Sequence, residues 1–136
     1  MPRALETGEI PGVIAEFGQA TENALKAGFD GVELHCASGY LPMQFLSTGT
    51  NTRTDRYGGS VENRIRAVVE MLESMVKAAG AGRVGIRICP GVLFNDISDT
   101  PHPNPQEFFD VQVAEQRLLL SLTAESISGA GWDDSV

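Results

Sequence analysis

The chain has 136 residues, of which 42% are apolar and 21% charged, and its formal net charge is −8. These proportions are typical of a globular protein of one ordinary domain. The acidic balance and the lack of a Lys/Arg cluster argue against nucleic acid and anionic membranes as partners. No apolar run approaches the roughly 20 residues that span a bilayer, and the first residues lack the apolar core of a signal peptide. We therefore expect a cytoplasmic protein.

The first part of the chain predicts a helix followed by a short strand. Residues 10–27 carry apolar side chains at helical spacing, with Pro11 in the first turn. Gly28 is placed to end this helix in the left-handed conformation. Residues 31–35 then predict a strand, and residues 36–59 a long polar connection. Connections of that length inside compact domains tend to carry function.

A second helix and a second strand follow in the same order. Ser60 is placed to cap a helix over residues 61–79, which has a continuous apolar stripe. We interpret the polar string before this helix as a structural brace between loop and helix, held by Asp55, Arg64 and the Ser60 cap. Residues 84–88, Val-Gly-Ile-Arg-Ile, predict the second strand.

The last third of the chain predicts a loop, a helix and a tail. Residues 90–104 read as a proline-containing loop. Asn104 and Pro105 then form an N-cap and a first-turn proline, which open a third helix that extends to about residue 122. The predicted domain therefore covers residues 1–123, and we expect residues 124–136 to form a loose C-terminal tail.

The order of these elements indicates the fold class. Alternating helices and strands argue for a parallel sheet with right-handed crossovers. A complete (β/α)8 barrel takes roughly 250 residues, and two strands cannot close one. The sequence therefore predicts an α/β fold that is a partial (β/α)8 TIM barrel, an interior α-β-α-β-α slice of a parallel barrel.

Side chains of the two predicted strands alternate between faces. Glu33 and His35 share one face of the first strand, and Arg87 lies on the matching face of the second. In a barrel this face points inward, so the three side chains should converge near the carboxyl-terminal mouth. Burying Glu33 or Arg87 alone would cost several kcal/mol, so we expect them to pair with each other or with a ligand. A buried Glu33–Arg87 bridge would still leave guanidinium donors for a ligand.

Two motifs between residues 31 and 64 resemble a known family. The first is Gly31-Val-Glu-Leu-His35-Cys-Ala-Ser38-Gly-Tyr40, and the second is Arg53-Thr-Asp-Arg-Tyr-Gly-Gly-Ser-Val-Glu-Asn-Arg64. With Pro2-Arg-Ala-Leu-Glu and Val84-Gly-Ile-Arg87, they resemble the old yellow enzymes, flavin mononucleotide (FMN)-dependent ene-reductases on a (β/α)8 barrel. The second motif is too long and too rigidly spaced for a chance match.

The resemblance implies roles for four residues. His35 matches a donor that binds the carbonyl or nitro oxygen of the substrate, and Ser38 stands where the family usually has a second donor, Asn or His. Tyr40 matches the general acid that protonates the α carbon, and Arg87 matches the arginine at the pyrimidine edge of the flavin. Serine puts its hydroxyl roughly 1–2 Å further from a shared oxygen than asparagine would. Because one oxyanion donor can be worth ~3 kcal/mol, activity on simple enones should fall, or the substrate should differ.

The implied reaction is FMN-mediated reduction of the activated C=C bond of an α,β-unsaturated carbonyl compound, with NAD(P)H as reductant. In the family, early strands contact the flavin ring and late strands hold its phosphate, and we expect neither region in this chain. Binding of FMN by this chain alone is therefore in question.

A second interpretation is a non-catalytic truncated fragment or relic that associates with itself or with a complementing fragment. A third is a non-redox isomerase on the same scaffold, with Tyr40 as its acid.

The two cysteines have a simple structural interpretation. Cys36 and Cys89 are far apart in sequence, and we expect two small reduced residues rather than a disulfide. A zinc site that joins them to His35 and His102 is a weaker alternative, because no tight ligand spacing is present. We therefore predict no metal site.

Overall fold

The computed structural model describes residues 3–89 together with residues 95 and 97. The predicted third helix and C-terminal tail lie outside these residues, so the domain boundary at residue 123 stays a prediction. The predicted helices and strands within the described part are confirmed, with bounds that differ by at most one residue. The elements are α1 (Ile10–Lys26), β1 (Val32–Cys36), α2 (Leu41–Leu46), α3 (Val61–Ala79), the short 3-10 helix η1 (Ala81–Arg83) and β2 (Val84–Ile88).

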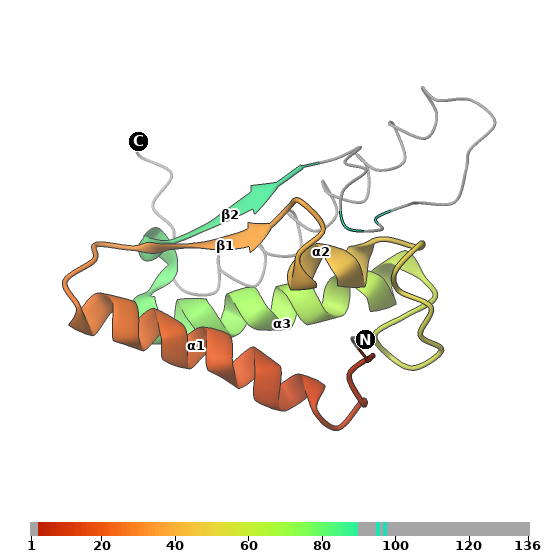
Figure 1. The fold of residues 1–136 in the computed structure, drawn as a ribbon. Helices are drawn as coiled ribbons and strands as arrows, with labels where there is room; N and C mark the ends of the chain where they lie inside the picture. The colour runs from red at the N-terminus through yellow and green to blue at the C-terminus, as the bar shows by residue number, and fades with distance from the viewer. Residues whose placement is uncertain (1–2, 90–94, 96, 98–136) are drawn as a thin grey trace.

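The described elements form two layers. β1 and β2 pair in parallel, with Val32 opposite Val84 and Cys36 opposite Ile88. Figure 1 shows α1 and α3 side by side against one face of the two strands. None of the helices in the described part is long and apolar enough to cross a membrane. Parallel strands joined through a helix confirm the predicted α/β arrangement.

The core lies between the two strands and the two long helices. Alternate residues of β1 point into it, and Leu34 and Cys36 are each 1% exposed. Helix α3 contributes the largest share, since its buried apolar residues run from Ile65 to Met75, about three turns of the helix. Burial of each large aliphatic side chain contributes about 1.5–3 kcal/mol. The buried apolar residues of α3 are Ile65, Ala67, Val68, Met71, Leu72 and Met75.

Helices α1 and α3 approach closely at one glycine. Gly18 is buried, and a β carbon built on it would lie 2.5 Å from Oγ of Ser74 and 3.1 Å from the Ser74 carbonyl oxygen. One turn further along α1, the buried hydroxyl of Thr21 donates to the carbonyl oxygen of Phe17 at 2.9 Å. The polar group is thus satisfied inside its own helix. Gly28 follows α1 with φ +95°, as the sequence predicted.

The predicted loop over residues 36–59 is partly wrong, because it contains α2. This helix has only six residues, too few for hydrophobic periodicity to be recognised. A proline in its first turn was the signal available in the sequence. The helix is held by burial of Pro42, Met43 and Phe45.

The rest of the connection is a brace, as predicted. The buried amide of Asn51 donates to the carbonyl oxygens of Phe45 at 2.6 Å and Tyr57 at 2.8 Å. The guanidinium of Arg64, on α3, donates to the carbonyl oxygens of Leu46 at 2.8 Å and Gly59 at 2.6 Å. Because these bonds satisfy loop carbonyls in place of water, they fix the loop between α2 and α3.

A second set of bonds ties the N-terminal segment to the same connection. Arg53 donates through Nε to Asp55 at 3.0 Å, and through Nη1 to the carbonyl oxygen of Leu5. Asp55 also accepts from the hydroxyl of Thr7 and from the backbone N–H of Tyr57. The hydrogen bond from Arg53 is the main reason that the pKa of Asp55 lies well below its usual range.

We predict that Gly18→Ala lowers the free energy of unfolding by about 1–3 kcal/mol, the usual cost of overpacking. The added carbon forces α1 away from the Ser74 carbonyl. Urea unfolding followed by circular dichroism measures the loss. Gly12→Ala is the matched control, because the same helix has nothing within 4 Å of a β carbon there. That variant should gain up to about 1 kcal/mol from helix propensity, and equal effects of the two variants would contradict the close approach.

We also predict a pH-dependent effect of Asp55→Asn. At neutral pH the variant should lose about 1.5–3 kcal/mol, the range for hydrogen bonds to a charged group. The folded pKa of Asp55 is depressed, so its contribution is complete above the unfolded value of about 3.9 and is lost as the pH falls toward the folded value. Urea unfolding at a series of pH values should show the two proteins converging on acidification.

Glu73→Gln is the control for that series, since Glu73 is an exposed carboxylate on α3. Its difference from the unsubstituted chain should stay small at every pH. If the deficit of Asp55→Asn did not change with pH, the ion pair with Arg53 would not be its source.

Candidate active site

The alternation along β1 and β2 separates a buried face from an exposed one. Leu34 and Cys36 face the helices, whereas Glu33 and His35 lie on the exposed side. The parallel register places His35 directly opposite Arg87. The predicted convergence of these side chains at the ends of neighbouring strands is therefore present in the fold.

Glu33 and Arg87 form the expected pair, but the pair is not buried. Nε of Arg87 donates to Oε1 of Glu33 at 2.7 Å, and the two side chains are 62% and 48% exposed, respectively. The expectation of burial is wrong because α1 and α3 cover the opposite face of the strands, and no element of the described part covers this one. In this environment water screens the pair, and its net contribution is small.

Tyr40 stands beside His35. The ring centroids are 5.4 Å apart with an interplanar angle of 52°, within the range of favourable aromatic contacts. Tyr40 occupies the N-cap position of α2 with an extended backbone, and it is 57% exposed. A hydroxyl donor and an imidazole thus lie together at the carboxyl end of β1, accessible to a small molecule.

Ser38 lies in the short turn that joins His35 to Tyr40. The backbone N–H of Tyr40 donates to the carbonyl oxygen of Ala37 at 3.2 Å, and Ser38 has φ +56°. Two residues to which the sequence gave no role hold this turn through their side-chain amides, Gln44 of α2 and Asn95 after β2. Sequence reasoning missed Asn95 because only the folded chain brings residue 95 next to residue 38, and it missed Gln44 because α2 was not predicted.

Within the described part of the chain neither cysteine belongs to a metal-binding group, and Cys36 is not placed for nucleophilic chemistry. Cys36 points away from His35 into the core, and burial raises the pKa of its thiol to about 12. The thiol therefore stays protonated and unreactive. Residues 3–89, 95 and 97 contain no group of three His, Cys, Asp or Glu side chains that could hold a metal ion, and His102 lies outside them.

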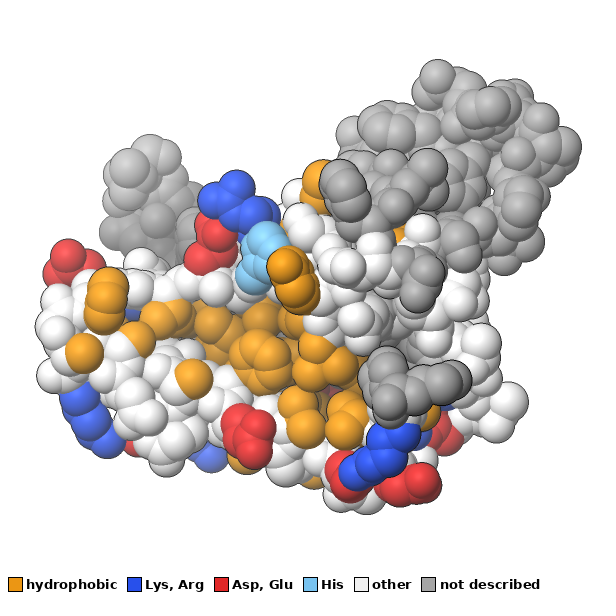
Figure 2. Space-filling model, in the orientation of Figure 1, with side chains coloured by type: hydrophobic (Ala, Val, Ile, Leu, Met, Phe, Trp, Pro, Cys, Tyr) orange, Lys and Arg blue, Asp and Glu red, His pale blue; other side chains and the backbone are white. Residues whose placement is uncertain are grey.

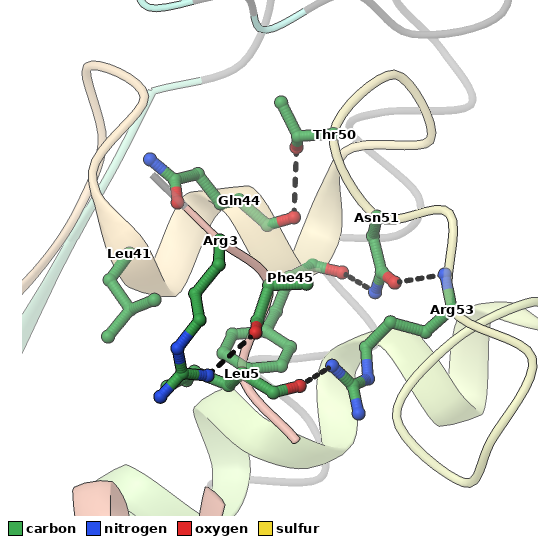
Figure 3. Close-up of a pocket in the computed structure, with 9 residues that line it drawn as sticks. Arg3, Leu5, Leu41, Gln44, Phe45, Thr50, Asn51 and Arg53 are labelled. Carbon is green, nitrogen blue, oxygen red and sulfur yellow. Dashed lines mark hydrogen bonds between the residues drawn. The ribbon is translucent and has the colours of Figure 1, made fainter. Parts of the chain in front are cut away.

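A separate pocket of about 120 Å³ lies between α2 and the N-terminal segment. Figure 3 shows it lined by Leu41, Gln44 and Phe45 of α2, with two arginines from outside the helix. Both arginines are already paired: Arg3 binds Glu9, and Arg53 binds Asp55. The pocket contains none of the predicted site residues, so we place the candidate active site at the strand ends.

The fold and the site together define a class: a parallel α/β protein that gathers hydrogen-bond donors and a cation at the carboxyl ends of neighbouring strands. The model of the NADH:flavin oxidoreductase / NADH oxidase family matches residues 1–127. The chain therefore belongs to this family. The match confirms the resemblance to the old yellow enzymes that the two sequence motifs indicated.

Individual relatives agree with the family match. The chain is 54% identical over 99 residues to 12-oxophytodienoate reductase 1 of Oryza sativa subsp. japonica, covering 73% of this chain and 26% of that protein. It is 50% identical over 99 residues to a probable flavin mononucleotide-dependent alkene reductase of Leishmania infantum, covering 73% of this chain and 27% of that protein. The chain thus spans about a quarter of the length of the curated relatives it matches.

A solved structure supports the same fold. A morphinone reductase mutant in complex with tetrahydroNAD is similar with a TM-score of 0.81 and 42% identity, over 93% of this chain and 32% of that one. Another similar structure is an old yellow enzyme homologue from Zymomonas mobilis, with a TM-score of 0.73 and 38% identity, over 86% of this chain and 32% of that one. These likenesses confirm the predicted partial (β/α)8 TIM barrel.

The side chains on the exposed face of the two strands are compatible with a flavin ring. A guanidinium has five N–H donors, and the bond to Glu33 uses one from Arg87. Beside it, Gly85 has no side chain, and a β carbon there would meet only Cγ of Glu33 at 3.9 Å and the carbonyl oxygen of Val32 at 4.0 Å. Arg87 thus has further N–H donors beside the open surface at Gly85. A positive charge there would stabilise a flavin ring, which becomes negatively charged when it is reduced.

We predict that Glu33→Gln changes the free energy of unfolding by less than about 1 kcal/mol, because an exposed ion pair is screened by water. Urea unfolding at low and at high salt measures the effect, and salt should reduce it further. A loss of about 3–5 kcal/mol would be the signature of a broken buried pair, and would show that this face is covered in solution.

Proposed function

We propose that the chain forms part of the active site of an FMN-dependent oxidoreductase of the ene-reductase type. Its reaction would be reduction of the activated C=C bond of an α,β-unsaturated carbonyl compound, with NAD(P)H as reductant. The observation that carries the proposal is the cluster at the strand ends. Tyr40 and His35 have ring centroids 5.4 Å apart, and the parallel register sets Arg87 opposite His35.

The proposed roles follow from the chemistry of these side chains. The imidazole of His35 and the hydroxyl of Ser38 would donate hydrogen bonds to the carbonyl oxygen of the substrate, which draws electrons from the conjugated double bond. The hydroxyl of Tyr40 would deliver a proton to the α carbon as general acid. Arg87 would bind the pyrimidine edge of FMN. FMN, when bound, supplies the hydride for the β carbon.

The relatives support this reaction type. One is described as an FMN-dependent alkene reductase, and a similar structure contains tetrahydroNAD, a nicotinamide analogue. Because the chain spans about a quarter of such proteins, their activity comes to this chain as a proposal, and the flavin titration below tests it on the chain itself. We further propose a cytoplasmic protein with a small-molecule partner and no nucleic-acid or membrane partner, in keeping with the net charge of −8 and the free thiols.

A non-catalytic fragment is the second candidate, and one observation favours it. Figure 2 shows hydrophobic side chains gathered in a band between the strand layer and the helices. Phe29, before β1, is 65% exposed. Apolar surface of this kind promotes self-association or pairing with a complementing fragment.

A flavin titration separates the candidates. FMN added to the purified chain should be retained on gel filtration with a protein-bound flavin spectrum. NADPH without oxygen should bleach this spectrum, and 2-cyclohexenone should restore it. A folded chain that retains no FMN would contradict the proposed role, and an associated chain without FMN would favour the non-catalytic fragment. Isomerisation of an unsaturated ketone without reductant would favour an isomerase.

Tyr40→Phe gives the titration its residue-level test. The ring contact with His35 remains, but the proton donor is lost, so reoxidation by the enone should slow by about 10²–10⁴-fold, the usual share of general acid catalysis. Bleaching by NADPH should keep its rate. Phe29→Leu is the control, since it removes an exposed aromatic ring at the other end of β1. Equal rates of reoxidation for the unsubstituted chain and Tyr40→Phe would exclude Tyr40 as the acid.

A further inference from the structure

The turn between His35 and Tyr40 has an unusual backbone for its sequence. It runs from Ala37 to Tyr40, and its two central residues both have positive φ, +56° at Ser38 and +75° at Gly39. Turns of this kind favour Asn or Gly at the first central position, because a left-handed backbone crowds other side chains. Serine lacks this preference, so the conformation of Ser38 needs support from elsewhere in the fold.

Two side-chain amides supply that support. Nδ2 of Asn95 donates to the carbonyl oxygen of Ser38 at 2.8 Å, and Nε2 of Gln44 donates to the carbonyl oxygen of Gly39 at 2.7 Å. They reach the turn from different places, because Gln44 projects from α2 (Figure 3) and Asn95 follows β2. Consecutive carbonyls of the turn are therefore held by two separate segments, helix α2 and the chain after β2.

The contact between Asn95 and Ser38 has a second distinctive feature. Asn95 has φ +54°, and it and Ser38 are the two non-glycine residues with positive φ in the described part of the chain. Each is thus in a sparsely populated conformation, and the two are hydrogen-bonded to each other. Such conformations persist where the surrounding structure fixes them, and they are concentrated at functional sites.

We propose that Asn95 and Gln44 are positioning residues for the site at the strand ends. They hold the Ser38-Gly39 turn in its left-handed form, and the turn sets the spacing between the ring of His35 before it and the ring of Tyr40 after it. The consequence for turnover rests on the proposed function. The effect on the ring contact does not, since it is a property of the folded chain.

The first test measures the contact between the His35 and Tyr40 rings by nuclear Overhauser effects and ring-current shifts in the full chain. Asn95→Gly keeps the freedom to adopt positive φ but removes the amide, and Gln44→Met keeps the length of the side chain without its donor. Both variants should weaken the ring contact. Gln19→Met is the matched control, because Gln19 is an exposed amide of α1 with partners only on its own helix.

A rescue distinguishes positioning from a general loss of structure. Ser38→Asn places the residue with the better left-handed preference at the turn, so it should restore the ring contact in the Asn95→Gly background. Failure of the rescue, or an unchanged ring contact in both Asn95→Gly and Gln44→Met, would overturn the proposal. The His35 signals are assigned with His102→Gln, which removes the second histidine.

The second test uses the flavin-loaded protein. Asn95→Gly should slow reoxidation by 2-cyclohexenone by about 10- to 100-fold, the range expected for a misplaced reacting group, with the affinity for FMN unchanged. If Asn95→Gly lowered the affinity for FMN by the same factor as the rate of reoxidation, the residue would have a general structural role, and the positioning role would be overturned. A chain that binds no FMN would refute the proposed function, and the ring contact alone would then decide the role of Asn95 and Gln44.

Discussion

The parallel register between β1 and β2 is the constraint on which the rest of the site depends. It sets His35 opposite Arg87, and the two-residue alternation of strands then assigns Glu33 to the same face and Cys36 to the core. A shift of one residue would send the imidazole into the hydrophobic core and expose the buried thiol. The buried side of the sheet therefore fixes the position of the polar groups on its other side.

The connection after β1 adds precision that the strands alone do not provide. Its first residues form a left-handed turn, α2 follows directly, and the remainder is braced against α3 by Asn51 and Arg64. Tyr40 stands where the turn meets the helix, so its backbone is held on both sides: its N–H donates to the carbonyl oxygen of Ala37, and its carbonyl oxygen accepts from the N–H of Gln44. The long loop is thus a scaffold for a small number of side chains.

Sequence reasoning recovered what depends on local pattern. The periods of α1, α3 and both strands, the Ser60 cap and the face shared by Glu33, His35 and Arg87 all follow from neighbours in the chain. Two features were not predicted. Helix α2 is too short to show a hydrophobic period, and the contact of Asn95 with Ser38 joins residues 57 positions apart in the sequence. The burial expected for Glu33 was wrong for another reason: α1 and α3 cover the opposite face of the strands, and no element of the described part covers the face with Glu33.

The bond between Thr7 and Asp55 has a consequence for the order in which this chain can fold. It joins residues 48 positions apart, so Thr7 lacks this partner until the loop before α3 exists. During synthesis at about 5–20 residues per second, α1 and β1 emerge seconds before the carboxylate that will anchor the segment in front of them. The N-terminal segment is therefore anchored late, and a nascent chain halted before Asp55 would leave it without that anchor.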